Sequence, residues 1–416
     1  MKVVLVSTYE QRGGAAIACF RLKNALQGKG VDVKMLTAYK TSDDPAVISP
    51  FDTRWKRIKN RYNFYKERFS IFMKNGFSRK NLFAVSTADS GTDISRLPVI
   101  READIIHLHW INQGFLSLRN IKQLIELGKP MVFTMHDMWY CTSICHHARS
   151  CDQFMSICRE CPYLQRPKVF DLAYNIWLKK LFMRNPDIVF TCVSRWLARR
   201  AGESGLMEMN RILVIPNVID TKVFYPRNRQ EERLALGISG ENKILVFGAA
   251  KLNDENKGFE LLKKALEESK YCKEIDLFLF GEIKKDNDFL KDMPCRFHYL
   301  GVIDNPEVLA GIYSAADVTV MPSHYETFGQ TLAESMACGT PTVAFNSSGQ
   351  TDIIDHLENG YLATYPSAHD FAKGIDWILD RTDHIMKEKC VNKVDRCFSS
   401  DVVVRQYLDL YDEMLE

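Results

Sequence analysis

The sequence predicts an α/β protein of two Rossmann-like, doubly wound domains, because short buried strands alternate with glycine-bearing loops and helices twice along the chain. Its 416 residues are too many for one compact core and fit two domains of ordinary size. We place an N-terminal domain over residues 1–219, a C-terminal domain over 220–396 and a last helical segment over 397–416.

The composition excludes several classes of protein. A hydrophobic content of 46% with 26% charged residues is normal for a soluble globular chain. We find no apolar stretch of about 18 residues and no signal peptide, so we expect a cytoplasmic protein. A net charge of +3 is too small to indicate nucleic acid as a partner. Twelve cysteines without a secretory signal indicate thiols or metal ligands rather than disulfides.

The first half begins with a strand over residues 2–8, and a loop then carries Gly13 and Gly14 to a helix over 15–27. Paired glycines at a helix entrance let the backbone approach a phosphate closely. The carboxyl ends of strands in an open α/β sheet are where ligands bind. Further strands of this half are expected at 31–36, 105–109, 131–134 and 188–193.

The pattern restarts around residues 212–220 and builds a second domain from about residue 220. We expect its ligand loops at 248–257, at 281–282 and after residue 321. The expected elements are strands at 243–248, 275–280, 297–301 and 318–321, with helices at 259–269 and 306–315.

Two glutamates flank the helix that follows the strand over 318–321. Glu326 falls in the strand-to-helix loop, and Gly329 permits close backbone approach where the helix begins. Free N–H groups at such a helix start suit a diphosphate. Glu334, about one turn further, can accept hydrogen bonds from two ribose hydroxyls, and Lys257 can neutralise a diphosphate. The alternative is that these residues are solvated charges around an ordinary helix.

Several motifs follow one another along nearly the whole chain, and their ordered combination is specific. They are Gly13 with Gly14, 215–217 with Asp220, Lys257 with Gly258, Glu326 and Glu334 with Phe328 and Gly329 between them, 339–344, and Asn359 with Gly360. On these motifs the chain resembles a family 4 (group 1) glycosyltransferase of the GT-B fold, in which two Rossmann-like domains face each other across a cleft. The resemblance implies retaining transfer from a nucleotide sugar without a catalytic divalent metal, and a last helix, here 402–415, that packs back on the N-terminal domain.

The resemblance also implies roles for individual residues. Glu334 resembles the ribose-binding glutamate, Glu326 the glutamate that holds the donor sugar, and Lys257 the phosphate-binding lysine, while Gly14 would lie near the diphosphate. The basic residue often found shortly before that lysine is not at its place, and Lys251 is the candidate substitute. The residues expected to contact sugar and phosphate through backbone N–H groups are Phe328, Gly329, Gln330, Thr331 and Leu332.

His136 follows the expected strand at 131–134, where related enzymes carry a histidine close to the reacting sugar. A neutral imidazole there can hydrogen-bond a sugar hydroxyl or stabilise the transition state, and the alternative is a packing role. We take His136 and Glu326 as the catalytic candidates. His107 and His109 share one face of a strand end, and either an acceptor contact or a structural hydrogen bond would explain them. With no convincing nucleophile, we expect same-face attack with the leaving diphosphate accepting the proton.

A cysteine-rich insert spans residues 141–161. Cys145, Cys151, Cys158 and Cys161 could supply four thiolates to a closed structural zinc site, and the alternative is a loop of reduced thiols. Residues 54–80 are basic and aromatic at roughly helical spacing. They could rest on an anionic membrane, or they could pack their aromatic side chains on the domain and leave the basic ones in water.

The sequence therefore predicts a cytoplasmic retaining glycosyltransferase with a nucleotide-sugar donor and a glycan or lipid-linked acceptor. A peripheral position at the inner face of the membrane is the second location that it allows. By analogy with the family, we expect a role in bacterial surface polysaccharide synthesis. The alternatives are a nucleotide-sugar epimerase of GT-B shape and a non-catalytic scaffold that binds a sugar nucleotide.

Overall fold

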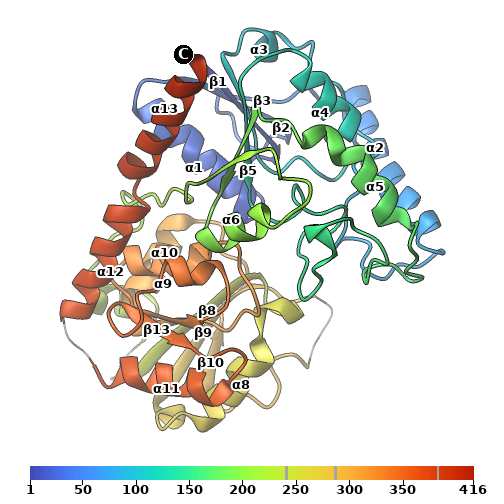
Figure 1. Cartoon of the computed structure of the whole chain (residues 1–416). Coiled ribbons are helices and arrows are strands. Elements are labelled where there is room, and N and C mark those ends of the chain that lie inside the picture. Colours follow the sequence, from blue (N-terminus) through green and yellow to red (C-terminus); the bar gives the residue numbers. More distant parts are fainter. Residues whose placement is uncertain (239–241, 285–287, 382–383) are drawn as a thin grey trace. The chain divides into compact units, whose positions relative to one another are not determined.

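The computed structural model describes residues 1–238, 242–284, 288–381 and 384–416 (Figure 1). The chain divides into two compact units. Unit 1 comprises Met1–Ile215 and Val404–Glu416, and unit 2 comprises Pro216–Val403. These boundaries lie a few residues from the expected ones at 219/220 and 396/397.

Unit 1 is built on a parallel sheet whose strand order is β3-β2-β1-β4-β5-β6-β7. The order reverses direction at β1, so the chain builds outward on both sides of this strand, as in a doubly wound fold. Its strands are β1 Lys2–Tyr9, β2 Asp32–Tyr39, β3 Val47–Ile48, β4 Ile105–Leu108, β5 Met131–Met135, β6 Ile188–Cys192 and β7 Arg211–Val214.

The helices of unit 1 follow clear local signals. Ser117, Asp171 and Ser194 each cap a helix through the side chain. The helices are α1 Gly14–Gly28, α2 Arg54–Lys74, α3 Pro98–Arg101, α4 Leu118–Ile125, α5 Leu172–Lys180 and α6 Arg195–Gly202, with 3-10 turns at Gln153–Met155 and Leu181–Met183.

Unit 2 holds a second parallel sheet, with strand order β10-β9-β8-β11-β12-β13. Its strands are β8 Lys243–Lys251, β9 Ile275–Glu282, β10 Arg296–Tyr299, β11 Val318–Met321, β12 Thr342–Phe345 and β13 Gly360–Ala363. Its helices are α7 Arg229–Ala235, α8 Phe259–Glu268, α9 Pro306–Ala315, α10 Gln330–Ala337, α11 Ala368–Leu379 and α12 His384–Cys397, with 3-10 turns at Glu255–Lys257, Cys272–Glu274 and Gly349–Asp352. In Figure 1, α8 and α11 cover one face of this sheet, and α9 and α10 the other.

The last helix, α13 (Ser400–Leu415), begins in unit 2 and ends in unit 1. Its unit 1 portion buries Tyr407 and Tyr411, which are 2% and 0% exposed. The hydroxyl of Tyr411 lies 2.7 Å from Nδ1 of His107 on β4, so the end of the chain is bonded to the first sheet.

Two expectations about strands were wrong. The segment at 211–214 is not the start of the second half: it is β7, which pairs with β6 in unit 1. The strand β8 runs on to Lys251, past a bulge after Gly248, so residues 248–251 are not a ligand loop. A Cβ at Gly248 would lie 1.9 Å from the ring of Phe280, so this glycine makes room for core packing.

Candidate functional site

An ion pair lies beside the carboxyl end of β11. Nζ of Lys257 is 2.6 Å from Oε1 of Glu326, and the two side chains are 25% and 16% exposed. Burial works against the lysine charge, but the charge and hydrogen bond of Glu326 raise the pKa of Lys257 above its usual value. The structure thus brings together two residues that the sequence assigned separately to phosphate and sugar.

The turn that carries Lys257 packs tightly on the loop after β11, and this packing brings Lys257 and Glu326 together. Gly258 has φ 67°, and a Cβ there would lie 2.0 Å from the carbonyl oxygen of Pro322. Nδ2 of Asn256 donates to the carbonyl of Tyr325 at 3.0 Å. Gly258 is therefore required both for its left-handed conformation and for the close approach of two backbones.

A third loop, which the sequence reasoning missed, holds Glu326 from the other side. The N–H of Glu326 donates to Oγ of Ser348 at 2.8 Å, and the N–H of Gly349 donates to the carbonyl of Glu326 at 2.8 Å. A Cβ at Gly349 would lie 2.2 Å from the carbonyl oxygen of Thr327. The signal was available, because this Ser-Ser-Gly-Gln run directly follows a buried strand that ends at the same edge of the sheet.

The helix α10 begins at the same place. Gly329 is its N-cap, with φ 106°, and the side chains of Gln330 and Thr331 are partly exposed. The first turn of a helix directs backbone N–H groups toward its N-terminus, where an anion is stabilised. Glu334 lies one turn in and is only 5% exposed.

Phe328 and Leu332 are core residues, 2% and 0% exposed. The ring of Phe328 packs edge-on against Phe398 at a centroid distance of 5.4 Å. The N–H of Leu332 donates to the carbonyl of Gly329 at 3.0 Å, so it closes the helix start and does not face a ligand as the sequence predicted. Lys251 is exposed at the end of β8, in register with Glu282 on β9.

In unit 1, Gly13 and Gly14 lie where β1 gives way to α1. Gly13 has φ 86° and is the N-cap of α1, and a Cβ there would meet nothing within 4 Å. The left-handed backbone explains this glycine, and the open space leaves room for a ligand to approach. Gly14 is the first residue of the helix.

Three histidines form a stacked row at this edge of unit 1. Nδ1 of His109 lies 2.9 Å from Nε2 of His136, and the ring centroids of His107 and His109 are 4.3 Å apart. Burial lowers the pKa of His107 to about 3 and that of His136 to about 4, and it lowers the pKa of His109 as well. All three are therefore neutral near pH 7.

The histidines differ in their surroundings. His107 is fixed between Tyr411 and Oγ1 of Thr134, at 2.7 and 2.6 Å, so its role is structural. His136 is partly exposed and is positioned by His109. Next to it, Asp137 accepts hydrogen bonds from Trp110 and His146, and although burial opposes its charge, His146 lowers the pKa of Asp137 to about 2.

The four cysteines expected at a metal site, Cys145, Cys151, Cys158 and Cys161, line one cavity of about 20 Å³ in unit 1. Within the described residues, no group of three or more His, Cys, Asp or Glu side chains is arranged so that it could hold a metal ion. All four cysteines are free thiols in the structure.

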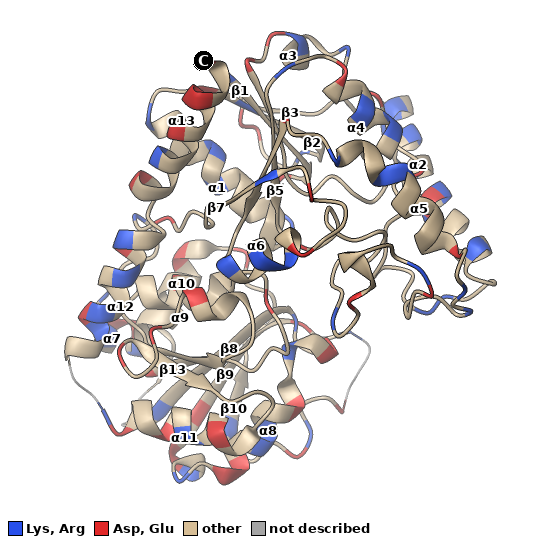
Figure 2. Ribbon diagram, in the orientation of Figure 1, with Lys and Arg blue, Asp and Glu red and all other residues tan. Residues whose placement is uncertain are grey.

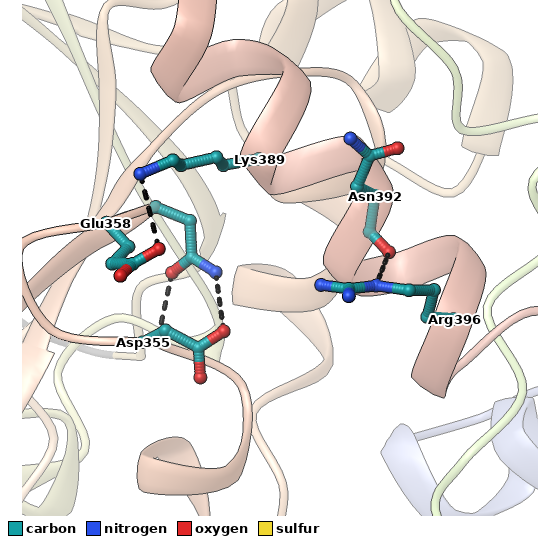
Figure 3. Close-up of a pocket in the computed structure, with 6 residues that line it drawn as sticks. Asp355, Glu358, Lys389, Asn392 and Arg396 are labelled. Carbon is teal, nitrogen blue, oxygen red and sulfur yellow. Dashed lines mark hydrogen bonds and ion pairs between the residues drawn. The ribbon is translucent and has the colours of Figure 1, made fainter.

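A larger hollow of about 430 Å³ lies elsewhere in unit 2, between the turn before β13 and helix α12 (Figure 3). Several of its polar side chains bond one another: Nζ of Lys389 lies 3.2 Å from Glu358, and Nδ2 of Asn359 donates to Asp355 at 3.2 Å. Asp355, Glu358 and Asn359 precede β13 and so lie at the amino end of the strands, opposite the edge that carries Glu326. Mutual pairing and position both argue against a donor site here.

Two family models match the chain. "Glycosyltransferase Family 4" matches residues 12–223, and "Glycosyl transferases group 1" matches residues 228–394. The chain therefore belongs to the family 4 (group 1) glycosyltransferases, and it is a transferase enzyme.

Individual relatives agree with the family. The chain is 28% identical over 390 residues to a D-inositol 3-phosphate glycosyltransferase from Arthrobacter sp. (strain FB24), covering 88% of this chain and 82% of the relative. It is 28% identical over 237 residues to an N-acetyl-alpha-D-glucosaminyl L-malate synthase from Bacillus anthracis, covering 55% and 60%.

The solved structures that resemble this chain show the fold. A sucrose-phosphate synthase from Thermosynechococcus elongatus matches with a TM-score of 0.69 and 21% identity over 99% of this chain and 98% of that one. HepE from Anabaena, in complex with UDP and glucose, matches with a TM-score of 0.64 and 15% identity over 99% and 100%. These likenesses confirm the predicted GT-B class.

Proposed function

We propose that this glycosyltransferase moves a sugar from a nucleoside diphosphate sugar, with retention of anomeric configuration, to a glycan or lipid-linked acceptor. The observation that supports this most directly is the Lys257–Glu326 pair, 2.6 Å apart, beside the start of α10. It places a cation, a carboxylate and a helix N-terminus at one sheet edge, which suits a diphosphate joined to a polyhydroxyl group.

Each group has a role in this proposal. The Lys257 ammonium and the first turn of α10 stabilise the charge that develops on the leaving diphosphate. Glu326 accepts hydrogen bonds from the donor sugar, and Glu334 accepts them from the ribose hydroxyls. Because Glu326 is engaged by Lys257, it is poorly suited to act as a nucleophile. The acceptor therefore attacks from the face that the diphosphate leaves, and a diphosphate oxygen takes the acceptor proton.

We propose that His136 hydrogen-bonds a substrate hydroxyl as a neutral imidazole. Its pKa of about 4 keeps it uncharged over the physiological range, and His109 fixes its ring through the 2.9 Å contact. A neutral ring adds no positive charge near an oxocarbenium-like transition state.

The donor proposal is tested by thermal shift with a panel of nucleotide sugars. UDP-glucose comes first in the panel, because the Anabaena HepE structures hold UDP and UDP-glucose. A ligand at 100 times its Kd raises the free energy of unfolding by about 2.7 kcal/mol. We expect Glu334→Gln to abolish the shift. Glu358→Gln, a change at the opposite edge of unit 2, should leave it unchanged. Absence of a shift in the wild type, or an equal shift in Glu334→Gln, would overturn the site assignment.

Turnover separates transfer from the alternatives. Glu326→Ala and His136→Ala should each lower transfer at least about 100-fold while the circular dichroism spectrum stays that of the wild type. NMR of the product shows whether the anomeric configuration of the donor is kept. Exchange at the sugar without an acceptor would instead indicate an epimerase, and full transfer by both variants would remove these residues from the mechanism.

We further propose that α2 binds the inner face of an anionic membrane, where lipid-linked acceptors of surface polysaccharide synthesis would be reached. A related fold supports this setting, since the neighbour WaaG is described as a glycosyltransferase involved in lipopolysaccharide biosynthesis. No helix in the described ranges is long and apolar enough to cross a membrane.

An ordinary surface helix buries an apolar face and exposes a polar one, and α2 does the reverse. Its buried face is polar: Oε1 of Glu67 accepts the N–H groups of Thr87 and Ala88 at 3.0 and 2.8 Å. Asn63 likewise bonds Ser90 at 3.1 Å. Of the two alternatives for this segment, packing of the aromatic side chains on the domain does not hold for Trp55, Tyr62, Tyr65 and Phe69, which are exposed. The exposed apolar side chains of α2, which recur every three or four residues, are Trp55, Ile58, Tyr62, Tyr65, Phe69 and Met73.

Basic residues are interleaved with this apolar face, as the blue segments along α2 show (Figure 2). Aromatic side chains that insert at the interface and cations that bind anionic headgroups are the two components of peripheral attachment, each cation contributing about 1 kcal/mol. We expect Trp55→Ser with Phe69→Ser to abolish sedimentation with vesicles containing phosphatidylglycerol. Leu234→Ser, which removes an apolar side chain 71% exposed on α7, is the matched control. Equal binding to purely zwitterionic vesicles would contradict the proposal that the basic residues of α2 bind anionic headgroups.

A further inference from the structure

We infer that Cys145, Cys151, Cys158 and Cys161 bind one structural zinc ion that holds together the long connection between β5 and α5. This connection, residues 136–171, contains only a 3-10 turn of regular structure, yet much of it is buried. Long irregular segments inside a compact unit need a local source of stability beyond an apolar core.

The four thiols converge on one small space. All of them line the same cavity of about 20 Å³, and three are nearly buried, with Cys145 and Cys158 8% exposed and Cys161 7%. A tetrahedral zinc with Zn–S distances of about 2.3 Å needs the sulfurs about 3.8 Å apart. In the structure the four thiols are not arranged so that they could hold a metal ion, so zinc binding requires their side chains to rotate toward the cavity that they line.

The backbone is bent at the two places where this convergence requires it. Arg149, between Cys145 and Cys151, has φ 53°, and Glu160, between Cys158 and Cys161, has φ 48°. A left-handed residue without the freedom of glycine is uncommon and costs free energy. One such residue between each pair of cysteines turns both pairs toward the cavity.

The backbone beside two of these cysteines forms hydrogen bonds with their sulfurs. Cys158 is hydrogen-bonded by the backbone of Ser143, and Cys161 by the backbone of Tyr163. Hydrogen bonds of this kind stabilise metal-bound sulfur and fix its orientation. His146 does not compete for the metal, because both of its ring nitrogens have partners: Nδ1 lies 2.7 Å from Asp137, and Nε2 lies 3.0 Å from Oγ of Ser86.

A buried lysine lies near these sulfurs. Lys180, at the end of α5, is 0% exposed, and its Nζ donates to the carbonyls of Trp139 and Thr142 at 2.5 and 3.0 Å. Burial lowers the pKa of Lys180 to about 7, while nearby groups, Cys145 and Cys158 among them, act in the opposite direction. Four thiolates around Zn²⁺ carry a net charge of −2, so this lysine, when protonated, offsets part of the cost of burying that charge.

The first test is the metal content of the full-length wild-type protein, measured by plasma mass spectrometry. We expect about one zinc per chain, and cobalt in its place should give the charge-transfer absorption of a tetrahedral thiolate site. Under denaturing conditions with chelator, alkylation should find all four cysteines as thiols. A protein without zinc whose four cysteines are thiols, or are joined in disulfides, would overturn the inference.

Variants locate the site. Cys158→Ser and Cys151→Ser should each lose the zinc, and the partly exposed Cys151 is the substitution better tolerated by the fold. Cys397→Ser, at a partly exposed cysteine of unit 2, is the matched control and should retain the full zinc content. Retention of zinc by both cluster variants would also refute the assignment.

Discussion

Replacing His107 with Phe should destabilise unit 1 at neutral pH and should lose that effect in acid. The substitution removes hydrogen bonds of 2.7 Å to Tyr411 and 2.6 Å to Thr134 from a fully buried position. Thr134 keeps Thr191 at 2.6 Å as a partner, whereas the hydroxyl of Tyr411 loses its bond to the sheet. Two lost hydrogen bonds and one poorly satisfied hydroxyl cost about 2–3 kcal/mol.

The pH dependence follows from the pKa of His107. Burial first, and the nearby His136 second, lower the pKa of His107 from 6.5 to about 3 in the folded chain. Above pH 6.5, His107 is neutral in both the folded and the unfolded chain, so it does not make the free energy of unfolding depend on pH. Below pH 6.5 the unfolded chain binds a proton that the folded chain does not, so stability falls by about 1.4 kcal/mol per pH unit. By pH 4.5 this proton uptake has lowered the free energy of unfolding of the wild type by about 2.7 kcal/mol, a loss that the His107→Phe variant does not undergo.

The assay is urea unfolding followed by tryptophan fluorescence from pH 7.5 to 4.5. This signal reports chiefly on unit 1, because all tryptophans except Trp377 lie there. The gap between wild type and His107→Phe should shrink from about 2–3 kcal/mol to near zero. Tyr411→Phe is the control, since it removes one hydrogen bond and leaves the histidine, and its gap should be independent of pH. A constant gap for His107→Phe would refute the argument, because it would mean that His107 titrates equally in both states.

Four further substitutions are expected to differ in their effect on stability. Gly258→Ala should destabilise unit 2 by about 1–3 kcal/mol, since the residue has φ 67° and its Cβ would lie 2.0 Å from the oxygen of Pro322. Gly237→Ala, at φ 72° but in open space, should cost less by thermal unfolding. Asp317→Asn should cost about 3–5 kcal/mol in the same assay, because the carboxylate is only 10% exposed and its loss leaves two arginines without their charge partner. Arg211→Ala removes an exposed ion pair with α13 and should leave the melting temperature unchanged, because exposed ion pairs contribute little to stability. A drop of several degrees would show that this pair does stabilise the fold.

Local signals made much of unit 2 predictable. Asn305 and Pro306 mark the start of α9, and Gly258 marks the start of α8, so these helices have the expected bounds within one residue. The β11–α10 unit was predictable for the same reason, since Pro322 and Gly329 punctuate it within a few residues. Capping and turn chemistry depend on near neighbours in the sequence, and one sequence displays them directly.

Residue roles that depend on distant segments were not predictable. Gly248 looked like a ligand glycine, yet it makes room for the ring of Phe280, from another strand. The sequence also did not show which face of α2 is buried. Glu67 and Asn63 form their hydrogen bonds with residues 87–90, which lie outside the helix. Periodicity alone would assign the aromatic stripe to the core.

The sequence by itself determined the family, the two α/β halves and the strand-to-helix loops that carry Glu326 and His136. It could do so because hydrophobic period, glycines and prolines act over a few residues. Only the tertiary structure decided that Lys257 and Glu326 pair, that His107 is a structural link to Tyr411, and that four cysteines share one cavity. Lys257 and Glu326 meet because parallel strands bring their carboxyl ends to one edge of a sheet. His107 and Tyr411 are joined by a helix at the far end of the chain, and the cysteines by the path of one irregular connection, neither of which a hydrophobic period reveals.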